Sequence, residues 1–195
     1  DLYFAHKDDP DVPLDEVLGA FAELVDAGIV RAIGASNYSA DRLAEALRIS
    51  DEKGLPRYTV VQPELNLLDR AQYEGALQRL CIDEGLGVVT YFSLASGYLS
   101  GKYRSTDDLG KSPRGARVGP YLEGKGPAVL AAMEAIAAET GATLSQIALA
   151  WVAAQPGVTA PIASATSIAQ LDDIVGSLDL ALTDTQLAAL TAAGA

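Results

Sequence analysis

The sequence predicts an α/β fold built on a parallel sheet. Short runs rich in β-branched residues alternate with longer stretches in which apolar residues recur every three or four positions, as in strands and helices. The strand-like runs begin near residues 2, 30, 58 and 87, and a spacing of about 28 residues is in the range of a strand–helix–strand unit. Each connection is long enough to hold a helix, so neighbouring strands are expected to be parallel.

The first half of the chain contains four expected strands and three expected helices. The first strand lies at residues 2–5, and the helix after it has one apolar face and ends at Ala27-Gly28. The residues of that face are Leu14, Val17, Leu18, Phe21, Leu24 and Val25. The elements that follow are a strand at 29–35, a helix from the N-cap Ser39 to Ser50, a strand at 58–62, a helix at 72–84 and a strand at 87–91.

The alternation of strands and helices breaks after residue 91. Residues 96–126 are rich in Gly, Ser, Pro, Lys and Arg, which predicts a long loop after the fourth strand, and a loop of this length is usually functional or mobile. Regular patterns then return as helices at 127–139 and 144–154, a fifth strand at 158–162, a helix from Ile168 and a last helix capped by Thr183. We expect residues 1–195 to form a single domain.

Two architectures have enough parallel strands to be considered. An open doubly wound sheet usually carries a Gly-rich turn after its first strand, and this sequence has none. A (β/α)8 TIM barrel typically needs about 250 residues, so 195 residues are too few by about three units. The sequence therefore predicts a partial (β/α)8 barrel without its N-terminal units, and an opening on Asp1 instead of Met agrees with that expectation.

The composition argues against several classes of function. With 14 Lys and Arg against 26 Asp and Glu, the net charge of −12 opposes binding to nucleic acid and to anionic membrane surfaces. One cysteine, Cys81, and one histidine, His6, argue against a disulfide scaffold and against Cys- or His-based metal sites. No apolar run has the length of a membrane span. A cytoplasmic protein without a metal is expected.

A polar or aromatic side chain follows every expected strand. Parallel α/β proteins collect their reactive groups at this edge, because the loops after the strands open on one face. Each position also has a plain structural interpretation, as a strand-end cap, a turn, a solvated side chain, a core aromatic or a helix cap. The five positions together favour a site more than any one of them does. They are His6, Ser36 with Asn37, Gln62, Tyr91, and residues 164–166.

Five short motifs carry these residues. They are DLYFAH at 1–6, GASNY at 34–38, VQPELN at 61–66, YFSLASG at 91–97 followed by GKY at 101–103, and PIASATS at 161–167. Each motif is weak alone, but the ordered set resembles the aldo-keto reductase family over the whole chain. The resemblance implies the C-terminal portion of such a barrel, its last five β/α units, in an enzyme that reduces aldehydes or ketones to alcohols with NADPH.

The resemblance also implies a role for each strand-exit residue. His6 would be the catalytic histidine that donates a hydrogen bond to the substrate carbonyl oxygen. The nicotinamide carboxamide would be held by Ser36, Asn37 and Gln62, and Tyr91 would stack on the nicotinamide ring. Ser164 and Thr166 would meet the adenosine phosphate end. The other implied cofactor-binding residues are Phe92, Ser93, Leu94, Ser96, Gly97, Lys102, Gln170 and Asp173.

Two features depart from the family pattern. The proton-donating tyrosine, with the lysine and aspartate that support it, falls before the position of residue 1, so this chain alone is expected to be inactive. Residues 166–170 carry no Lys or Arg to pair with the 2′-phosphate of NADP, although Lys102 or Arg104 from the long loop can supply a cation. NADP(H) is the implied cofactor, and NAD(H) stays open.

Two other functions stay open beside a reductase with a small carbonyl substrate. A non-catalytic interaction subunit on a reductase-like scaffold, like the potassium-channel β subunits, would bind the cofactor and use residues 96–126 for docking, and fold alone does not decide between the two. A (β/α)8 isomerase or aldolase fits less well, because no Schiff-base lysine or carboxylate stands at a strand exit.

Overall fold

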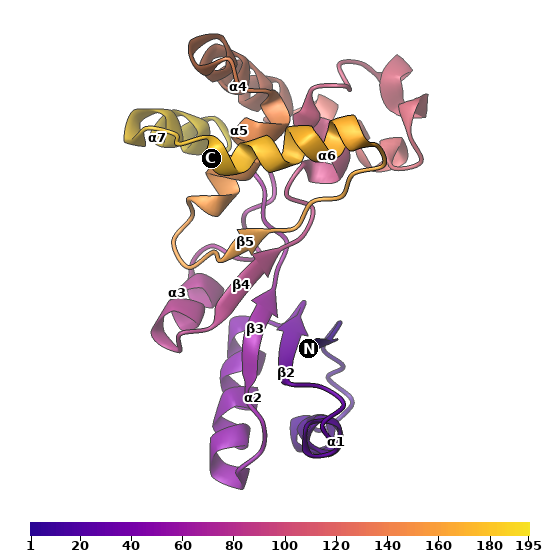
Figure 1. Ribbon diagram of the computed structural model, residues 1–195, viewed down its shortest axis with the longest axis vertical. Coiled ribbons are helices and arrows are strands. Elements are labelled where there is room, and N and C mark those ends of the chain that lie inside the picture. Colours follow the sequence, from indigo (N-terminus) through magenta and orange to yellow (C-terminus); the bar gives the residue numbers. More distant parts are fainter. The chain divides into compact units, whose positions relative to one another are not determined.

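A computed structural model describes all 195 residues, which form two compact units (Figure 1). Unit 1 comprises residues 1–63 and 71–89, and unit 2 comprises residues 64–70 and 90–195. The chain has a five-stranded parallel sheet with the strand order β1-β2-β3-β4-β5. The expected α/β class with five parallel strands is therefore confirmed.

Unit 1 repeats one pattern of a strand followed by a helix. Its strands are β1 (Leu2–Ala5), β2 (Ala32–Ser36), β3 (Tyr58–Gln62) and β4 (Gly87–Thr90), of which β4 ends at the first residue of unit 2. Its helices are α1 (Leu14–Asp26), α2 (Ala40–Lys53) and α3 (Ala76–Asp83). Strands β1, β2, β3 and β4 pair in parallel in that order, so the exits of the first three strands fall at one edge.

The first turn of α2 is stabilised by a side-chain cap. The Ser39 hydroxyl accepts a hydrogen bond from the Arg42 backbone N–H at 3.2 Å, which satisfies a free donor in the first turn of α2. Leu43 and Leu47 place their side chains in the core on the inner face of this helix. The Ser39 cap is therefore confirmed, and α2 extends three residues beyond the predicted end at Ser50.

Two elements of unit 1 begin later than predicted. β2 begins at Ala32 and not at residue 29, because the N–H groups of Ile29 and Val30 donate to the Leu24 carbonyl and close the end of α1. α3 begins at Ala76 and not at residue 72, because Gly75 has a φ of 94°, a conformation that a helix does not contain. The boundary is set by a backbone hydrogen bond at β2 and by a backbone conformation at α3.

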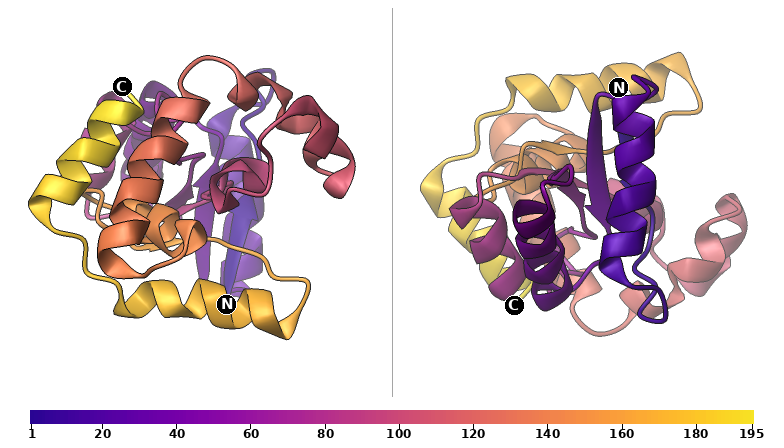
Figure 2. Two further views of the ribbon diagram at one scale, coloured as in Figure 1. Left: turned by 90° about the horizontal axis from the view of Figure 1, so that it is seen from above. Right: turned by 90° about the horizontal axis from the view of Figure 1, so that it is seen from below.

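Unit 2 contains four α-helices, and one of them carries a buried tryptophan. They are α4 (Gly126–Thr140), α5 (Leu144–Ala153), α6 (Ile168–Val175) and α7 (Asp184–Ala193). Figure 2 shows α4, α5 and α7 close together, and the fully buried Trp151 of α5 donates from Nε1 to Thr191 Oγ1 of α7 at 3.0 Å. Thr183 caps α7 as predicted. None of the helices combines the length and the apolarity that crossing a bilayer requires.

Strand β5 (Ala160–Pro161) has only two residues, against the predicted five at 158–162. Val158 closes a turn by donating its N–H to the Gln155 carbonyl at 3.1 Å, which takes it out of the strand. The Ile162 N–H donates to the Thr90 carbonyl at 2.8 Å, so strand-like pairing continues one residue past the end of β5.

The segment between β4 and α4 is a series of four short 3-10 helices. They are η1 (Ala95–Ser100), η2 (Thr106–Lys111), η3 (Gly115–Arg117) and η4 (Gly119–Leu122). The backbone packs tightly here, since a Cβ atom on Gly115 would lie 1.7 Å from the Leu109 carbonyl oxygen. The expected long loop at 96–126 therefore has defined local structure of its own.

Candidate functional site

In unit 1, the polar residues at the exits of β1, β2 and β3 form one hydrogen-bonded cluster. Asn37 Nδ2 donates to the His6 carbonyl oxygen at 2.8 Å and to Ser36 Oγ at 3.1 Å. Ser36 Oγ in turn donates to the Gln62 carbonyl oxygen at 2.7 Å. The structure thus brings together His6, Ser36, Asn37 and Gln62, which the sequence had placed at three separate strand exits.

The members of this cluster differ in what they can offer a ligand. Ser36 is only 1% exposed. Its hydroxyl accepts from Asn37 and donates to the Gln62 carbonyl, so it links β2 to β3 by a hydrogen bond. Gln62 contributes its backbone carbonyl, which leaves its half-buried side-chain amide with a donor and an acceptor. The His6 side chain is exposed.

Asn37 holds the cluster together from a left-handed backbone conformation. Its φ is 58°, a region that Asn tolerates better than most side chains. Gln72 Nε2 donates to Asn37 Oδ1 at 3.2 Å, and sequence reasoning missed this contact because residue 72 was taken as the start of a helix. The signal that can find it is a polar residue in the turn before α3.

The segment after β1 is fixed by a two-pronged ion pair. Arg42 of α2 donates from Nε to Asp8 Oδ2 at 2.8 Å and from NH2 to Asp8 Oδ1 at 2.9 Å. The hydrogen bond to Asp8 raises the pKa of the Arg42 guanidinium above its usual value. Because Asp8 is two residues from His6, this pair limits how far the histidine backbone can move.

In unit 2, the exit of β4 is a turn with unusual backbone geometry. Phe92, Ala95 and Ser96 have φ values of 53°, 47° and 56°, and each left-handed residue other than glycine costs roughly 1 kcal/mol. Hydrogen bonds compensate, since the Ala95 N–H donates to the Phe92 carbonyl at 2.7 Å and Ser93 Oγ donates to the Thr90 carbonyl at 3.2 Å. Strain retained in one turn is typical of binding sites.

An aromatic surface lies at this turn. The rings of Tyr91 and Phe92 are half-buried and meet edge to face, with centroids 5.2 Å apart. The Arg117 guanidinium of η3 lies 5.4 Å from the Phe92 ring centroid. Sequence reasoning missed Arg117, because its place beside Phe92 depends on the path of the segment after β4. An aromatic pair beside a cation suits a flat ring that carries anionic groups.

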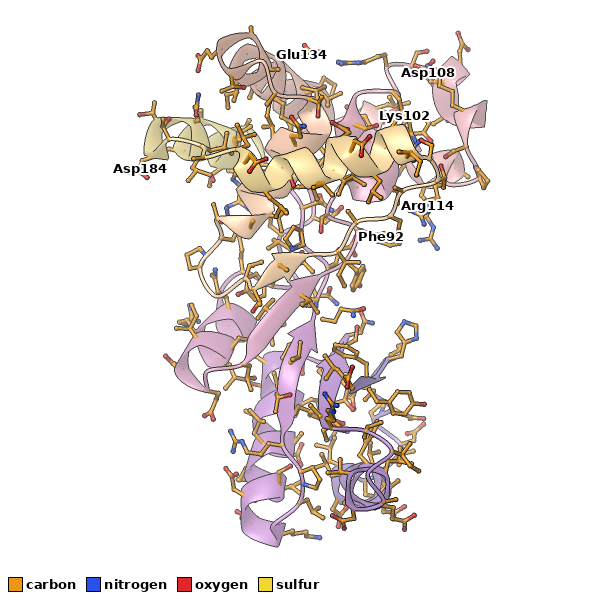
Figure 3. The ribbon with its side chains drawn as sticks, in the orientation of Figure 1. Phe92, Lys102, Asp108, Arg114, Glu134 and Asp184 are labelled. Carbon is orange, nitrogen blue, oxygen red and sulfur yellow. The ribbon has the colours of Figure 1, made fainter.

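Lys102 follows η1 in the segment after β4 (Figure 3). Its ammonium is exposed and sits 5.2 Å from the Tyr103 ring centroid. A Cβ atom on Gly97 would lie 3.2 Å from Lys102 Nζ, so the backbone at Gly97 passes close to this cation. By contrast, Ser93 and Ser96 are buried within the turn.

The residues around the start of α6 cap that helix. Thr166 donates from its backbone N–H and from Oγ1 to Gln170 Oε1, at 2.9 and 3.0 Å. Ser164 is exposed beside them, while Asp173 accepts a hydrogen bond from Thr143 Oγ1 at 2.6 Å and so ties α6 to the start of α5. The four predicted residues in this region are Ser164, Thr166, Gln170 and Asp173, and Asp173 is the one that joins two helices by a hydrogen bond.

Residues 64–70 contribute a side chain that sequence reasoning missed as a site residue. Asn66 is completely buried, and its Oδ1 accepts from the N–H groups of Leu68 and Asp69 at 2.8 and 2.9 Å. Its Nδ2 donates to Asp69 Oδ2 at 3.0 Å and to the Phe92 carbonyl at 3.2 Å. Asn66 stands in the VQPELN motif, but neither its burial nor its partners can be read from that motif.

Each unit holds groups that fit one kind of chemical moiety. The amide of Gln62 matches the donor and acceptor of a carboxamide, and the Tyr91–Phe92 pair beside Arg117 matches an aromatic ring with anionic substituents. No group of three or more His, Cys, Asp or Glu side chains is placed to hold a metal ion.

Comparisons with known proteins place the chain in a family. The model of the aldo/keto reductase family matches residues 1–195. The probable aldo-keto reductase 1 of Glycine max is 33% identical, over 96% of this chain and 53% of its own length. A probable voltage-gated potassium channel subunit beta of Arabidopsis thaliana is 30% identical, over 92% of this chain and 56% of its own length. The chain spans about half the length of these curated relatives.

A solved structure extends the comparison to the fold. The crystal structure of the thermostable aldo-keto reductase Tm1743 with the inhibitor epalrestat superposes with a TM-score of 0.78 and 29% identity. The superposition covers 100% of this chain and 60% of that chain, so the parallel sheet aligns with part of an aldo-keto reductase TIM barrel. On the evidence of the family match and the shared fold, the chain belongs to the aldo/keto reductase family.

Proposed function

We propose that this chain is the cofactor-binding portion of an NAD(P)H-dependent oxidoreductase that, at full length, reduces aldehydes or ketones to alcohols. The observation that carries the proposal is the hydrogen-bonded cluster of His6, Ser36, Asn37 and Gln62 at three neighbouring strand exits. The portion would be the last five β/α units of the barrel. Its one cysteine is buried, and a cytoplasmic location is proposed with it.

In this proposal the residues of unit 1 orient the reacting groups. NAD(P)H supplies the hydride when bound. The exposed His6 imidazole donates a hydrogen bond to the substrate carbonyl oxygen, and the bond from Asn37 to the His6 carbonyl keeps that residue in place. Gln62 binds the nicotinamide carboxamide through its side-chain amide, with Asn37 and Ser36 behind it.

The residues of unit 2 would bind the rest of the cofactor. Tyr91 stacks on the nicotinamide ring, while Phe92, Ser93, Leu94, Ser96 and Gly97 form the turn that presents it. Lys102 offers its exposed ammonium to a phosphate, and Ser164, Thr166 and Gln170 would meet the adenosine phosphate end, with Asp173 behind them. NADP(H) is the proposed cofactor, since one relative is named aldo-keto reductase yakc [NADP(+)]; NAD(H) is the second candidate.

Titration of the purified chain with NADPH tests cofactor binding. We expect saturable binding that Gln62→Met weakens and that the control Gln78→Met on α3 leaves unchanged, because only the first substitution removes the proposed carboxamide contact. Equal affinities for the two variants would contradict the assignment of Gln62. A chain that binds no nicotinamide cofactor would contradict the proposed function.

A second assay tests whether the chain catalyses reduction alone. We expect no turnover of an aromatic aldehyde with NADPH, because the proposal places the proton donor in another portion of the full-length protein. The matched control is a full-length aldo-keto reductase under the same conditions. Turnover by the chain at the rate of this control would show that the chain contains its own proton donor.

A cofactor-binding interaction subunit is the second candidate function. It is favoured by two relatives at 30% and 31% identity that are named probable voltage-gated potassium channel subunit beta. An interaction subunit would form a stoichiometric complex with a membrane protein that survives Tyr91→Ala but not substitutions in residues 105–122. A reductase would lose NADPH binding with Tyr91→Ala and would form no such complex.

A further inference from the structure

We propose that Asn66 is a positioning residue that fixes the turn after β4 and thereby sets the orientation of the Tyr91–Phe92 aromatic pair for the cofactor. The inference rests on the proposed function, because it concerns the same cofactor site. It stands on the geometry of unit 2 alone, and three sets of contacts within that unit carry it.

The first contact set is around the Asn66 amide itself. The side chain is completely buried and uses both N–H groups and its oxygen, with two acceptors and two donors as partners. Only a carboxamide of this length offers both functions at these positions, since a carboxylate has no N–H and an aliphatic side chain has neither. Asn66 is therefore held in a single orientation.

The second contact set joins Asn66 to the strained turn. The Phe92 carbonyl accepts from Asn66 Nδ2 at 3.2 Å and from the Ala95 N–H at 2.7 Å. A change of Phe92 from its φ of 53° to an ordinary backbone conformation would move this carbonyl away from both donors. The residue before it is held by the same segment, because the Leu65 N–H donates to the Tyr91 carbonyl at 3.4 Å.

The third contact set links this turn to the segment after it. Tyr121 donates from its hydroxyl to Asp69 Oδ2 at 2.6 Å, and the same oxygen accepts from Asn66 Nδ2. Burial, with the hydrogen bond to Asp69, raises the pKa of the Tyr121 hydroxyl, so it remains a donor at neutral pH. Tyr121 lies in η4, four residues after the Arg117 that covers the Phe92 ring.

The test compares two ligands on the variant Asn66→Asp, which keeps the shape of the side chain and both N–H acceptances. It removes the donations to the Phe92 carbonyl and to Asp69 Oδ2, and it places a second carboxyl group beside Asp69. We expect NADPH to bind about 10-fold more weakly. We expect 2′-phospho-ADP-ribose, which lacks the nicotinamide ring, to bind as it does to the unaltered chain. Equal weakening of both ligands would show a merely structural role and would overturn the proposal, as would unchanged binding of NADPH.

A second measurement follows the turn without any ligand. The exchange rate of the Ala95 amide hydrogen reports on the bond to the Phe92 carbonyl, and we expect Asn66→Asp to raise it about 10-fold. The control is Thr191→Val, which removes the hydrogen bond from Trp151 in the same unit but leaves the turn intact. An Ala95 exchange rate that matches this control would overturn the proposal.

The two measurements separate this inference from the proposed function. If the unaltered chain binds neither NADPH nor 2′-phospho-ADP-ribose, the proposed function fails and the cofactor role of Asn66 fails with it. Ala95 exchange then still decides whether Asn66 holds the turn. If Asn66→Asp does not fold, Tyr121→Phe replaces it, and we expect Ala95 exchange above that of Thr191→Val; exchange equal to the control would overturn the proposal.

Discussion

Removal of the Ser36 hydroxyl is expected to loosen the cluster at the strand exits of unit 1. In Ser36→Ala, the Gln62 carbonyl loses a donor at 2.7 Å and one N–H of Asn37 Nδ2 loses its acceptor at 3.1 Å. A hydrogen bond of this kind contributes about 0.5–1.5 kcal/mol to stability. Since two are lost at a residue that is 1% exposed, we expect a loss of about 2 kcal/mol in the free energy of unfolding.

The control is Ser50→Ala, which makes the same chemical change at another serine of unit 1 that is 1% exposed. Its hydroxyl donates once, to the Pro56 carbonyl at 3.0 Å, so the expected loss is about 1 kcal/mol. Urea unfolding followed by far-ultraviolet circular dichroism measures both variants. A Ser36→Ala variant no less stable than Ser50→Ala would refute the reasoning, because the bond to Asn37 would then contribute nothing.

Three further predictions concern unit 2. Ser96→Gly relieves a φ of 56°, so we expect thermal unfolding to show a gain of about 1 kcal/mol; an unchanged melting temperature would argue against strain at Ser96. Hydrogen bonds from Lys111 and two backbone N–H groups lower the pKa of Asp108 to about 2. Its ionised form therefore stabilises η2 above the ordinary pKa of 3.8, and this contribution is lost as the pH falls towards 2. The protection of the η2 amides, measured as the exchange rate of the unfolded chain divided by the observed rate at the same pH, should fall between pH 5 and pH 2, and less so in Asp108→Asn. Burial raises the pKa of Glu64 above 4.5, so its charge opposes folding at neutral pH and this penalty disappears on acidification. At pH 7, Glu64→Gln should therefore unfold at a higher urea concentration than the unaltered chain. Equal midpoint concentrations of urea would contradict this.

Elements with local end signals could be predicted closely from the sequence. The hydroxyls of Ser39 and Thr183 cap α2 and α7 as expected, because a cap involves residues only three positions apart. The strand-exit cluster was also predictable, since parallel strands bring their carboxyl ends to one edge whatever the details of the packing. Residues 6, 36, 37 and 62 meet there for that reason.

The features that the sequence did not predict depend on contacts between distant residues. The start of β2 shifted because Ile29 and Val30 close the end of α1, and η1 to η4 replaced a featureless loop because of close backbone packing such as that at Gly115. The contacts of Asn66 and Arg117 with Phe92 could not be predicted for the same reason. Their importance depends on partners at Phe92, 26 residues away from Asn66 along the chain.

The path of residues 64–70 has a consequence for how the protein can be made and divided. The chain leaves unit 1 after Pro63, contributes seven residues to unit 2 and returns to unit 1 at Ala71. Leu65 and Leu67 are completely buried, and Gly194 at the end of α7 packs so closely on the Leu67 carbonyl that a Cβ atom there would lie 2.1 Å from its oxygen. A fragment of residues 90–195 alone would therefore lack two leucines that are buried in unit 2, and we expect it to be less stable than a fragment that also supplies residues 64–70.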